Sequence, residues 1–237
     1  MRYLKYLLFI GIAFLLHSCS DHESDDLFTD DTTEEYQLYD YYVDDYGNEG
    51  IVVYIQSSNH YSKKYIIVLS ADESDQSWGP MGELVYDCDS IKFSDLKEPA
   101  FGVAVLQSMK SRGIDRFPAQ AWCDQKNQSE PYPRGGSWRL PTYDEFKKIF
   151  KSGNNLSDIN NALFAIGGTT VNEEYFYWTC VEDFDGYITI EQQTLDYDKE
   201  NRAILSTPTN STFSNKDRWI KKNKYNVRAI KYIYYHQ

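Results

Sequence analysis

The sequence predicts one α+β domain that follows an export signal and an acidic segment. Three observations predict this class. β-branched and aromatic runs come first, amphipathic helical patterns occupy the middle, and strand-like runs return toward the C-terminus. This order favours α+β over an alternating parallel sheet. The 237 residues are 41% hydrophobic and 16% aromatic, which is enough for one sizeable core.

The first 18 residues have the pattern of an export signal. Arg2 and Lys5 precede a ten-residue apolar run at 7–16, which is too short to cross a bilayer of about 30 Å as a helix. The run ends in Leu-His-Ser-Cys at residues 16–19, which resembles a bacterial lipobox. The resemblance implies that Cys19 is acylated and becomes a lipid anchor in the membrane. An ordinary signal peptide is the alternative.

Residues 19–46 are predicted to form an acidic, flexible tether. Between Ser20 and Glu35 the chain carries eight acidic residues and no Lys or Arg, so this run repels itself. Residues 20–26 resemble the acidic signal that sends Bacteroidetes lipoproteins to the outer face of the outer membrane. The expected location is therefore the outer membrane, facing the cell exterior. The Tyr- and Asp-rich stretch at 36–46 is either tether or a first strand.

The folded domain is predicted over residues 47–237, and it begins with a hairpin. The runs 51–55 and 65–69 are β-branched and aromatic, and a polar segment separates them. A helix is predicted over 101–109, ended by Gly113.

A second helix has the clearest local signal. Thr142 and Glu145 form a capping box, with Thr142 as the N-cap and Glu145 at the third helical position. Apolar residues at helical spacing are expected to face the core: Tyr143, Phe146, Ile149 and Phe150.

The last part of the chain is predicted to hold a short helix and three strands. The helix is expected at 157–166, and the strands at 175–178, 187–195 and 227–235. The last strand would tie the C-terminus into a sheet.

Residues 138–146 read Trp-Arg-Leu-Pro-Thr-Tyr-Asp-Glu-Phe. This run resembles the signature of bacterial C-type-lectin-like domains, which include formylglycine-generating enzymes and Fibrobacter-type major paralogous domains. The runs at 177–179 and 227–230 resemble two later strands of that family. The resemblance covers about residues 47–237 and implies a C-type-lectin-like fold, with mostly antiparallel strands, two to three helices and long late loops.

The residues of these motifs are interpreted as fold-forming rather than as a site. Trp138 and Leu140 can be buried against the sheet, Pro141 fixes the entry into the helix, and Arg139 can pair with a carboxylate. The whole set is Trp138, Arg139, Leu140, Pro141, Thr142, Glu145, Trp178 and Arg228.

Catalysis and resident cofactors are not expected. The formylglycine-generating relatives use a pair of late cysteines, whereas Cys180 is the last cysteine of this chain. None of the four His has zinc-site spacing or an obvious nucleophile partner. Calcium remains an alternative because residues 182–186 and 196–201 offer oxygen ligands, although neither segment has EF-hand spacing.

The three cysteines after the lipobox allow at most one disulfide among themselves. Cys88 and Cys123 flank the helix predicted at 101–109 and are the expected pair if a disulfide forms. Buried free thiols are the alternative.

Binding of a glycan or a protein ligand is the expected function. Lectin-like folds commonly carry ligands on the segment between the later strands, here about residues 180–225. Aromatic residues among polar ones are typical of a recognition surface. The candidate ligand-binding residues are Tyr187, Tyr197, Trp219 and Tyr225. Core packing is the alternative for each, although charged neighbours, including Lys221 and Lys222, favour a surface setting for Trp219.

Net charge and context define the function classes that remain. With 24 Lys+Arg, 36 Asp+Glu and a formal net charge of -12, no nucleic-acid partner is expected. A surface binding module, such as an adhesin or pilus-associated protein, is the main hypothesis. The alternatives are a structural accessory subunit docked on another envelope protein, and a ligand-binding protein diversified by a retroelement.

Overall fold

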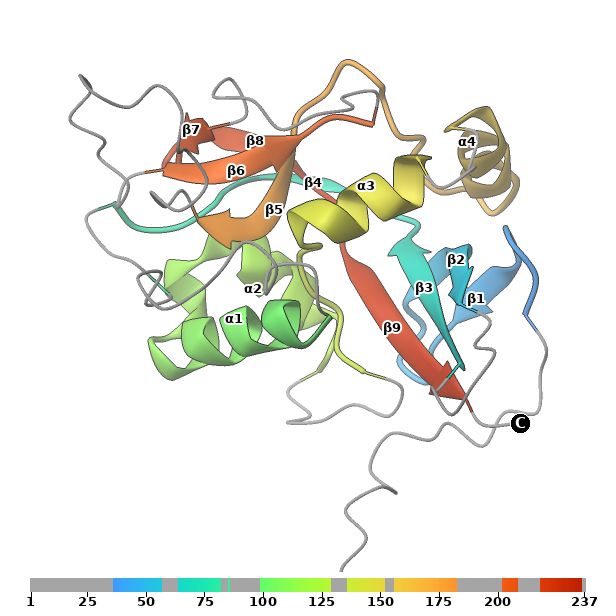
Figure 1. Ribbon diagram of the computed structural model, residues 1–237, viewed down its shortest axis with the longest axis horizontal. Coiled ribbons are helices and arrows are strands. Elements are labelled where there is room, and N and C mark those ends of the chain that lie inside the picture. Colours follow the sequence, from blue (N-terminus) through green and yellow to red (C-terminus); the bar gives the residue numbers. More distant parts are fainter. Residues whose placement is uncertain are drawn as a thin grey trace, which may run out of the picture.

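The computed structural model describes residues 36–56, 64–81, 85, 99–128, 136–151, 156–182, 202–208 and 218–235. Over these residues the predicted α+β class is confirmed, with four α-helices and two mostly antiparallel sheets (Figure 1). The export signal, Cys19, the tether up to residue 35 and the strand expected at 187–195 lie outside the described residues.

The first sheet has the strand order β1-β2-β3-β9 and is antiparallel throughout. Its strands are β1 (Tyr41–Val43), β2 (Glu49–Gln56), β3 (Lys64–Ser70) and β9 (Ile230–Tyr235). The predicted hairpin is confirmed as β2 and β3. Because Tyr42 of β1 pairs with Gly50, the stretch at 36–46 supplies a first strand, and the domain boundary expected at residue 47 falls inside this pairing.

The second sheet has the order β4-β8-β5-β6-β7. Its strands are β4 (Ser74–Ser77), β8 (Lys224–Val227), β5 (Tyr177–Glu182), β6 (Arg202–Ser206) and β7 (Arg218–Ile220). The pairing of β5 with β8 is parallel, and the other pairings are antiparallel. Every residue of β5 is buried, so this strand lies in the middle of the core.

The single closing strand expected at 227–235 was wrong, because the chain changes sheets within it. β8 ends at Val227 in the second sheet, and β9 begins at Ile230 in the first. Between them the buried Arg228 guanidinium donates to the carbonyl of Ser70 and to the carboxylate of Glu73. These bonds hold the junction between β8 and β9 against the turn between β3 and β4.

Four helices pack around the sheets, namely α1 (Pro99–Ser111), α2 (Pro118–Gln125), α3 (Tyr143–Lys151) and α4 (Leu156–Ala165). α1, α3 and α4 match the three predicted helices. α2 was not predicted because its eight residues are too few for a clear helical pattern, and only three of them are buried. In Figure 1, α1 and α2 lie together below the second sheet, and α3 lies between the two sheets. A short 3-10 helix, Ile114–Arg116, precedes α2.

Both faces of the first sheet are buried along most of β2 and β3, which explains the unbroken apolar runs of these strands. Ile66 and Val68 of β3 face the core shared with α1, α2 and the second sheet. Ile67 and Leu69 face the other core, which α3 and α4 cover. Alternate residues of β3 therefore pack into two different cores, one on each face of the sheet.

Candidate functional site

The motif at 138–146 is part of the core, as its fold-forming interpretation expects. Glu145 accepts hydrogen bonds from Arg139 Nη2 at 2.6 Å and from Arg139 Nη1 at 2.7 Å. The predicted capping box is confirmed: the Thr142 amide donates to Glu145 Oε2 at 2.7 Å, and the Glu145 amide donates to Thr142 Oγ1 at 3.1 Å. Burial alone would lower the pKa of Arg139, but the Glu145 carboxylate outweighs it and raises that pKa.

The other motif residues are also buried and have internal partners. Trp138, Leu140, Pro141 and Trp178 are buried, and the Trp178 indole donates to the carbonyl of Gln76 at 2.9 Å. Arg228 forms an ion pair with Glu73 at 2.6 Å. These side chains join α3, the second sheet and the β3–β4 turn, and they leave no surface for a ligand.

Asp44, in the turn between β1 and β2, connects this turn to the motif at 138–146. Its Oδ2 accepts a hydrogen bond from the Trp138 indole at 2.8 Å and lies 3.5 Å from the ammonium of buried Lys231. The Asn48 side chain donates to both of its oxygens. Burial would raise the pKa of Asp44, but the bonds from Trp138 and Asn48 and the charge of Lys231 outweigh it, so the pKa is lowered.

The late-segment candidates are not brought together by the described residues. Tyr187 and Tyr197 lie outside them, and for Trp219 only the backbone is described, in β7 opposite Ala203. The half-buried Tyr225 packs edge-on against Trp178, with ring centroids 5.3 Å apart. Tyr225 therefore extends the core, the alternative that sequence analysis had left open.

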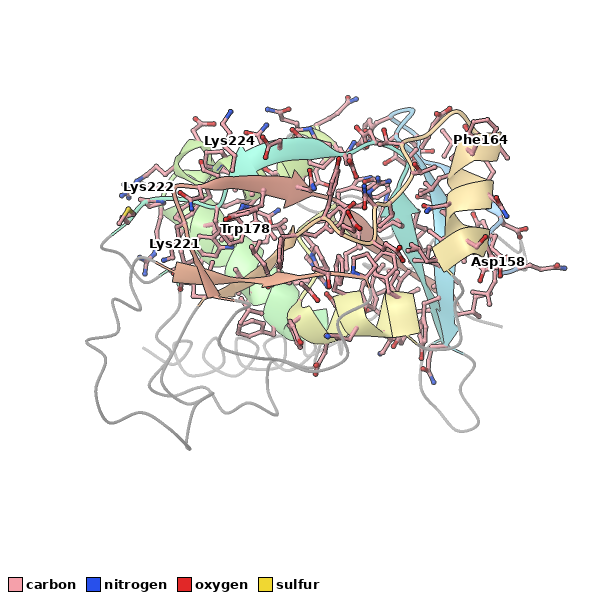
Figure 2. The ribbon with its side chains drawn as sticks, turned by 90° about the horizontal axis from the view of Figure 1, so that it is seen from above. Asp158, Phe164, Trp178, Lys221, Lys222 and Lys224 are labelled. Carbon is pink, nitrogen blue, oxygen red and sulfur yellow. The ribbon has the colours of Figure 1, made fainter. Side chains whose placement is uncertain are left out.

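Lys221, one of the charged neighbours that favoured a surface setting for Trp219, is itself buried. Lys221 is 0% exposed, and its Nζ lies 2.5 Å from Glu182 Oε1 and 4.7 Å from the centre of the Trp78 ring. A buried ammonium needs such a carboxylate, and the ring face adds a second favourable contact. Lys222 and Lys224 are exposed, and Figure 2 shows them at the outer end of the second sheet, far from Phe164 of α4.

The described cysteines are buried thiols. Neither Cys123 nor Cys180 forms a disulfide within the described part of the chain, and Cys88 lies outside that part. Burial raises the pKa of Cys180 to about 12, so its thiolate is scarce at neutral pH.

The described residues contain no group of three or more His, Cys, Asp or Glu side chains that could hold a metal ion. None of the helices in the same residues is long and apolar enough to cross a membrane.

Four tyrosines form an aromatic surface on one face of the first sheet, here called the tyrosine platform. Its members are Tyr54 of β2, Tyr65 of β3, and Tyr232 and Tyr234 of β9. Ring centroids lie 6.0 Å apart for Tyr54 and Tyr65, 5.1 Å for Tyr65 and Tyr232, and 5.9 Å for Tyr65 and Tyr234. Tyr65 is therefore the centre of the platform.

The platform arises from strand alternation and register. Tyr65 pairs with Tyr234, and Ile67 pairs with both Tyr54 and Tyr232, so all of these side chains share one face. Further along β3, α3 and α4 cover this face. The start of β3 and the end of β9 extend past α3 (Figure 1). Tyr54, Tyr65 and Tyr234 are accordingly half-buried, whereas Tyr232 is only 5% exposed.

Lys148 of α3 borders the platform. Its Nζ donates to the Tyr65 hydroxyl at 3.3 Å and lies 4.9 Å from the centre of the Tyr54 ring. The Tyr54 hydroxyl donates to Gln56 Oε1 at 2.7 Å. The site thus combines ring faces, hydroxyl groups and one cation on rigid strands, a composition suited to a ligand with both apolar and polar surfaces.

The four tyrosines of the platform lie in runs that the sequence predicts as strands, and the sequence did not assign them to a site. The available signal was the concentration of Tyr at the strand ends, at 54, 65, 232 and 234. Their meeting depends on β9 pairing with β3, which joins residues more than 160 positions apart in the chain.

Comparisons of the chain with protein-family models, curated proteins and solved structures found no match. Function is therefore inferred from the residues and their geometry.

Proposed function

We propose that this protein is a non-catalytic lipoprotein of the outer membrane surface whose C-type-lectin-like domain binds a glycan through the tyrosine platform. The platform is the observation that carries the proposal. Sugars present apolar C–H faces and polar hydroxyls, and half-buried tyrosine rings offer a complementary surface with little side-chain entropy to lose.

The N-terminal sequence supports the proposed location. The lipobox-like run ending at Cys19 supports a lipid anchor, and the acidic run after it supports display on the cell exterior. A rigid platform on an anchored domain would hold a glycan close to the membrane without further chemistry.

The buried thiol of Cys180 supports binding without catalysis. The formylglycine-generating relatives named above depend on reactive cysteines, whereas this thiol is 1% exposed and its pKa is raised by burial to about 12. A reactive cysteine needs the opposite surroundings, with partial exposure and a lowered pKa.

A glycan array probed with the full chain in mild detergent tests the proposal. Tyr65→Ala should weaken binding about tenfold or more, the usual cost of losing a central aromatic contact. Tyr65→Phe keeps the ring and should retain most of the affinity. Tyr54→Ala should weaken binding less, because its ring contacts only one other platform ring.

Tyr175→Ala is the matched control, because Tyr175 is 48% exposed and lies outside the platform. Circular dichroism and thermal melts would establish that each variant is folded. Folded Tyr65→Ala that binds glycans as the wild type does would overturn the assignment of the platform. A folded wild-type chain that binds no glycan would overturn the proposed function.

A second candidate function, an accessory subunit docked on another envelope protein, is favoured by β1. This strand is one of the two outer strands of the first sheet, and Leu38, Tyr41 and Val43 around it are 44%, 47% and 49% exposed. Outer strands can pair with a strand of another protein. Cross-linking in cells should then recover a partner from the wild type but not from Val43→Lys, with glycan binding unaffected.

A further inference from the structure

Lys148 differs in its surroundings from six other buried or half-buried cations, each of which forms an ion pair with a carboxylate. Its side chain is half-buried between α3 and the tyrosine platform. The contacts of its Nζ are the Tyr65 hydroxyl at 3.3 Å, the Tyr54 ring at 4.9 Å and the Tyr65 ring at 5.9 Å. Ring faces attract an ammonium without neutralising its charge.

Six other buried or half-buried cations of the described residues pair with carboxylates. Such ion pairs are formed by Lys110, Lys126, Arg139, Lys221, Arg228 and Lys231. No carboxylate of the described residues lies within 4.0 Å of Lys148 Nζ, although the chain carries 36 Asp+Glu against 24 Lys+Arg. The ammonium has three donor hydrogens, and the Tyr65 hydroxyl accepts one of them.

We infer that the tyrosine platform binds a carboxylated sugar, a uronic or sialic acid residue, whose carboxylate pairs with Lys148. This inference rests on the proposed glycan-binding function and names its ligand class. The ring of the sugar would contact the tyrosine faces, and its carboxylate would supply the anion that this ammonium lacks among the described residues. Hydrogen bonds between charged groups are roughly twice as strong as neutral ones, so the carboxylate should decide specificity.

The overall charge of the protein makes this local cation more important. A formal net charge of -12 repels acidic polymers at long range, and salt at physiological strength screens that repulsion beyond about 8 Å. Recognition of an acidic sugar would then depend on direct contact with Lys148 and little on long-range steering.

Two pairs of probes, each an acidic sugar and its neutral methyl ester, test the inference. Oligogalacturonate is compared with its methyl ester, and sialyllactose with the methyl ester of its sialic acid residue, by titration calorimetry of the full chain in mild detergent. The wild type should bind the acidic member of at least one pair about tenfold more tightly. The pair that shows the preference distinguishes uronic from sialic acid.

Three variants test whether Lys148 is the cation responsible for the preference for the acidic probe. Lys148→Gln should remove the preference for the acidic probe. Lys148→Arg should retain most of it, because the guanidinium is also a cation. Lys147→Gln is the matched control, since it removes the same charge from the next residue of α3, whose ammonium lies over the Tyr143 ring instead.

The outcomes separate this inference from the proposed function. Equal binding of acidic and neutral probes, lost in Tyr65→Ala, would overturn the acidic preference and leave glycan binding intact. A preference that persists in Lys148→Gln would overturn the role of Lys148. Folded wild type that binds none of the four probes, but does bind other glycans on the array, would also refute the inference. Folded wild type that binds no glycan at all would refute both the inference and the proposed glycan-binding function.

Discussion

Glu145→Gln is expected to destabilise the fold strongly, because it leaves the Arg139 guanidinium buried without its carboxylate. Arg139 is 2% exposed and Glu145 is 1% exposed, and two hydrogen bonds of 2.6 and 2.7 Å join them. Gly102 of α1 packs so closely that a Cβ there would overlap the guanidinium. The Arg139 side chain therefore cannot easily move to reach water.

The magnitude follows from this burial. Removing one partner of a buried ion pair costs about 3–5 kcal/mol. The carboxamide oxygen that Glu145→Gln introduces can still accept the hydrogen bond from the Thr142 amide, so the capping box adds little to the loss. At about 2–4 °C per kcal/mol for a chain of this size, the melting temperature should fall by roughly 6–20 °C.

Urea unfolding of wild type, Glu145→Gln, Arg139→Met and the double variant measures the effect. The double variant should be more stable than the sum of the two losses predicts, because it leaves no unpaired buried charge. Asp144→Asn is the control, since it removes one charge from the same helical turn and should cost only about 0.3–1 kcal/mol. If the stability losses of Glu145→Gln and Arg139→Met add up to that of the double variant within about 0.5 kcal/mol, the two residues do not act as a buried ion pair.

Two further predictions concern titratable groups. The pKa of Asp44 is lowered below its usual 3.8, so the stability it adds is present above that pH and is lost as pH falls through the folded-state pKa. Urea unfolding of wild type and Asp44→Asn from pH 7 to pH 3 measures this stability. Asp44→Asn should be less stable than wild type at neutral pH, and the difference in unfolding free energy should shrink below about pH 4. A difference that stays constant over this pH range would contradict the prediction. Burial raises the pKa of both the Cys123 and the Cys180 thiols, so neither should react with iodoacetamide at pH 8 in the native protein, whereas both should react in guanidinium. Peptide mapping by mass spectrometry reads this out, and modification of either thiol before unfolding would count against the described burial.

Much of the local structure could be predicted from the sequence. The capping box at Thr142 and Glu145 appears with both of its hydrogen bonds, and the hairpin of β2 and β3 lies where the apolar runs place it. β4 was missed because its sequence, Ser-Asp-Gln-Ser, has no strand-like pattern. It becomes a strand because β8 pairs with it.

The candidate site could not be predicted in the same way. The late segment was chosen for its composition, but Tyr225 extends the core and Lys221 is buried against Glu182. Composition indicates which residue types are present, and it does not indicate which of them another element will cover. Tyr65 was noted as a strand residue, yet its role at the centre of the platform depends on two neighbouring strands.

The class of the domain, the positions of α1, α3 and α4 and the alternation of its strands followed from the sequence alone, because periodicity and capping act within a few neighbouring residues. The tertiary structure alone decided that the chain changes sheets at Arg228 and that β9 joins β3 to assemble the tyrosine platform. It also decided that Lys148 faces aromatic rings while buried Arg139 and Lys221 face carboxylates. These features depend on contacts between residues far apart in the chain, and such contacts exist only once the elements have packed.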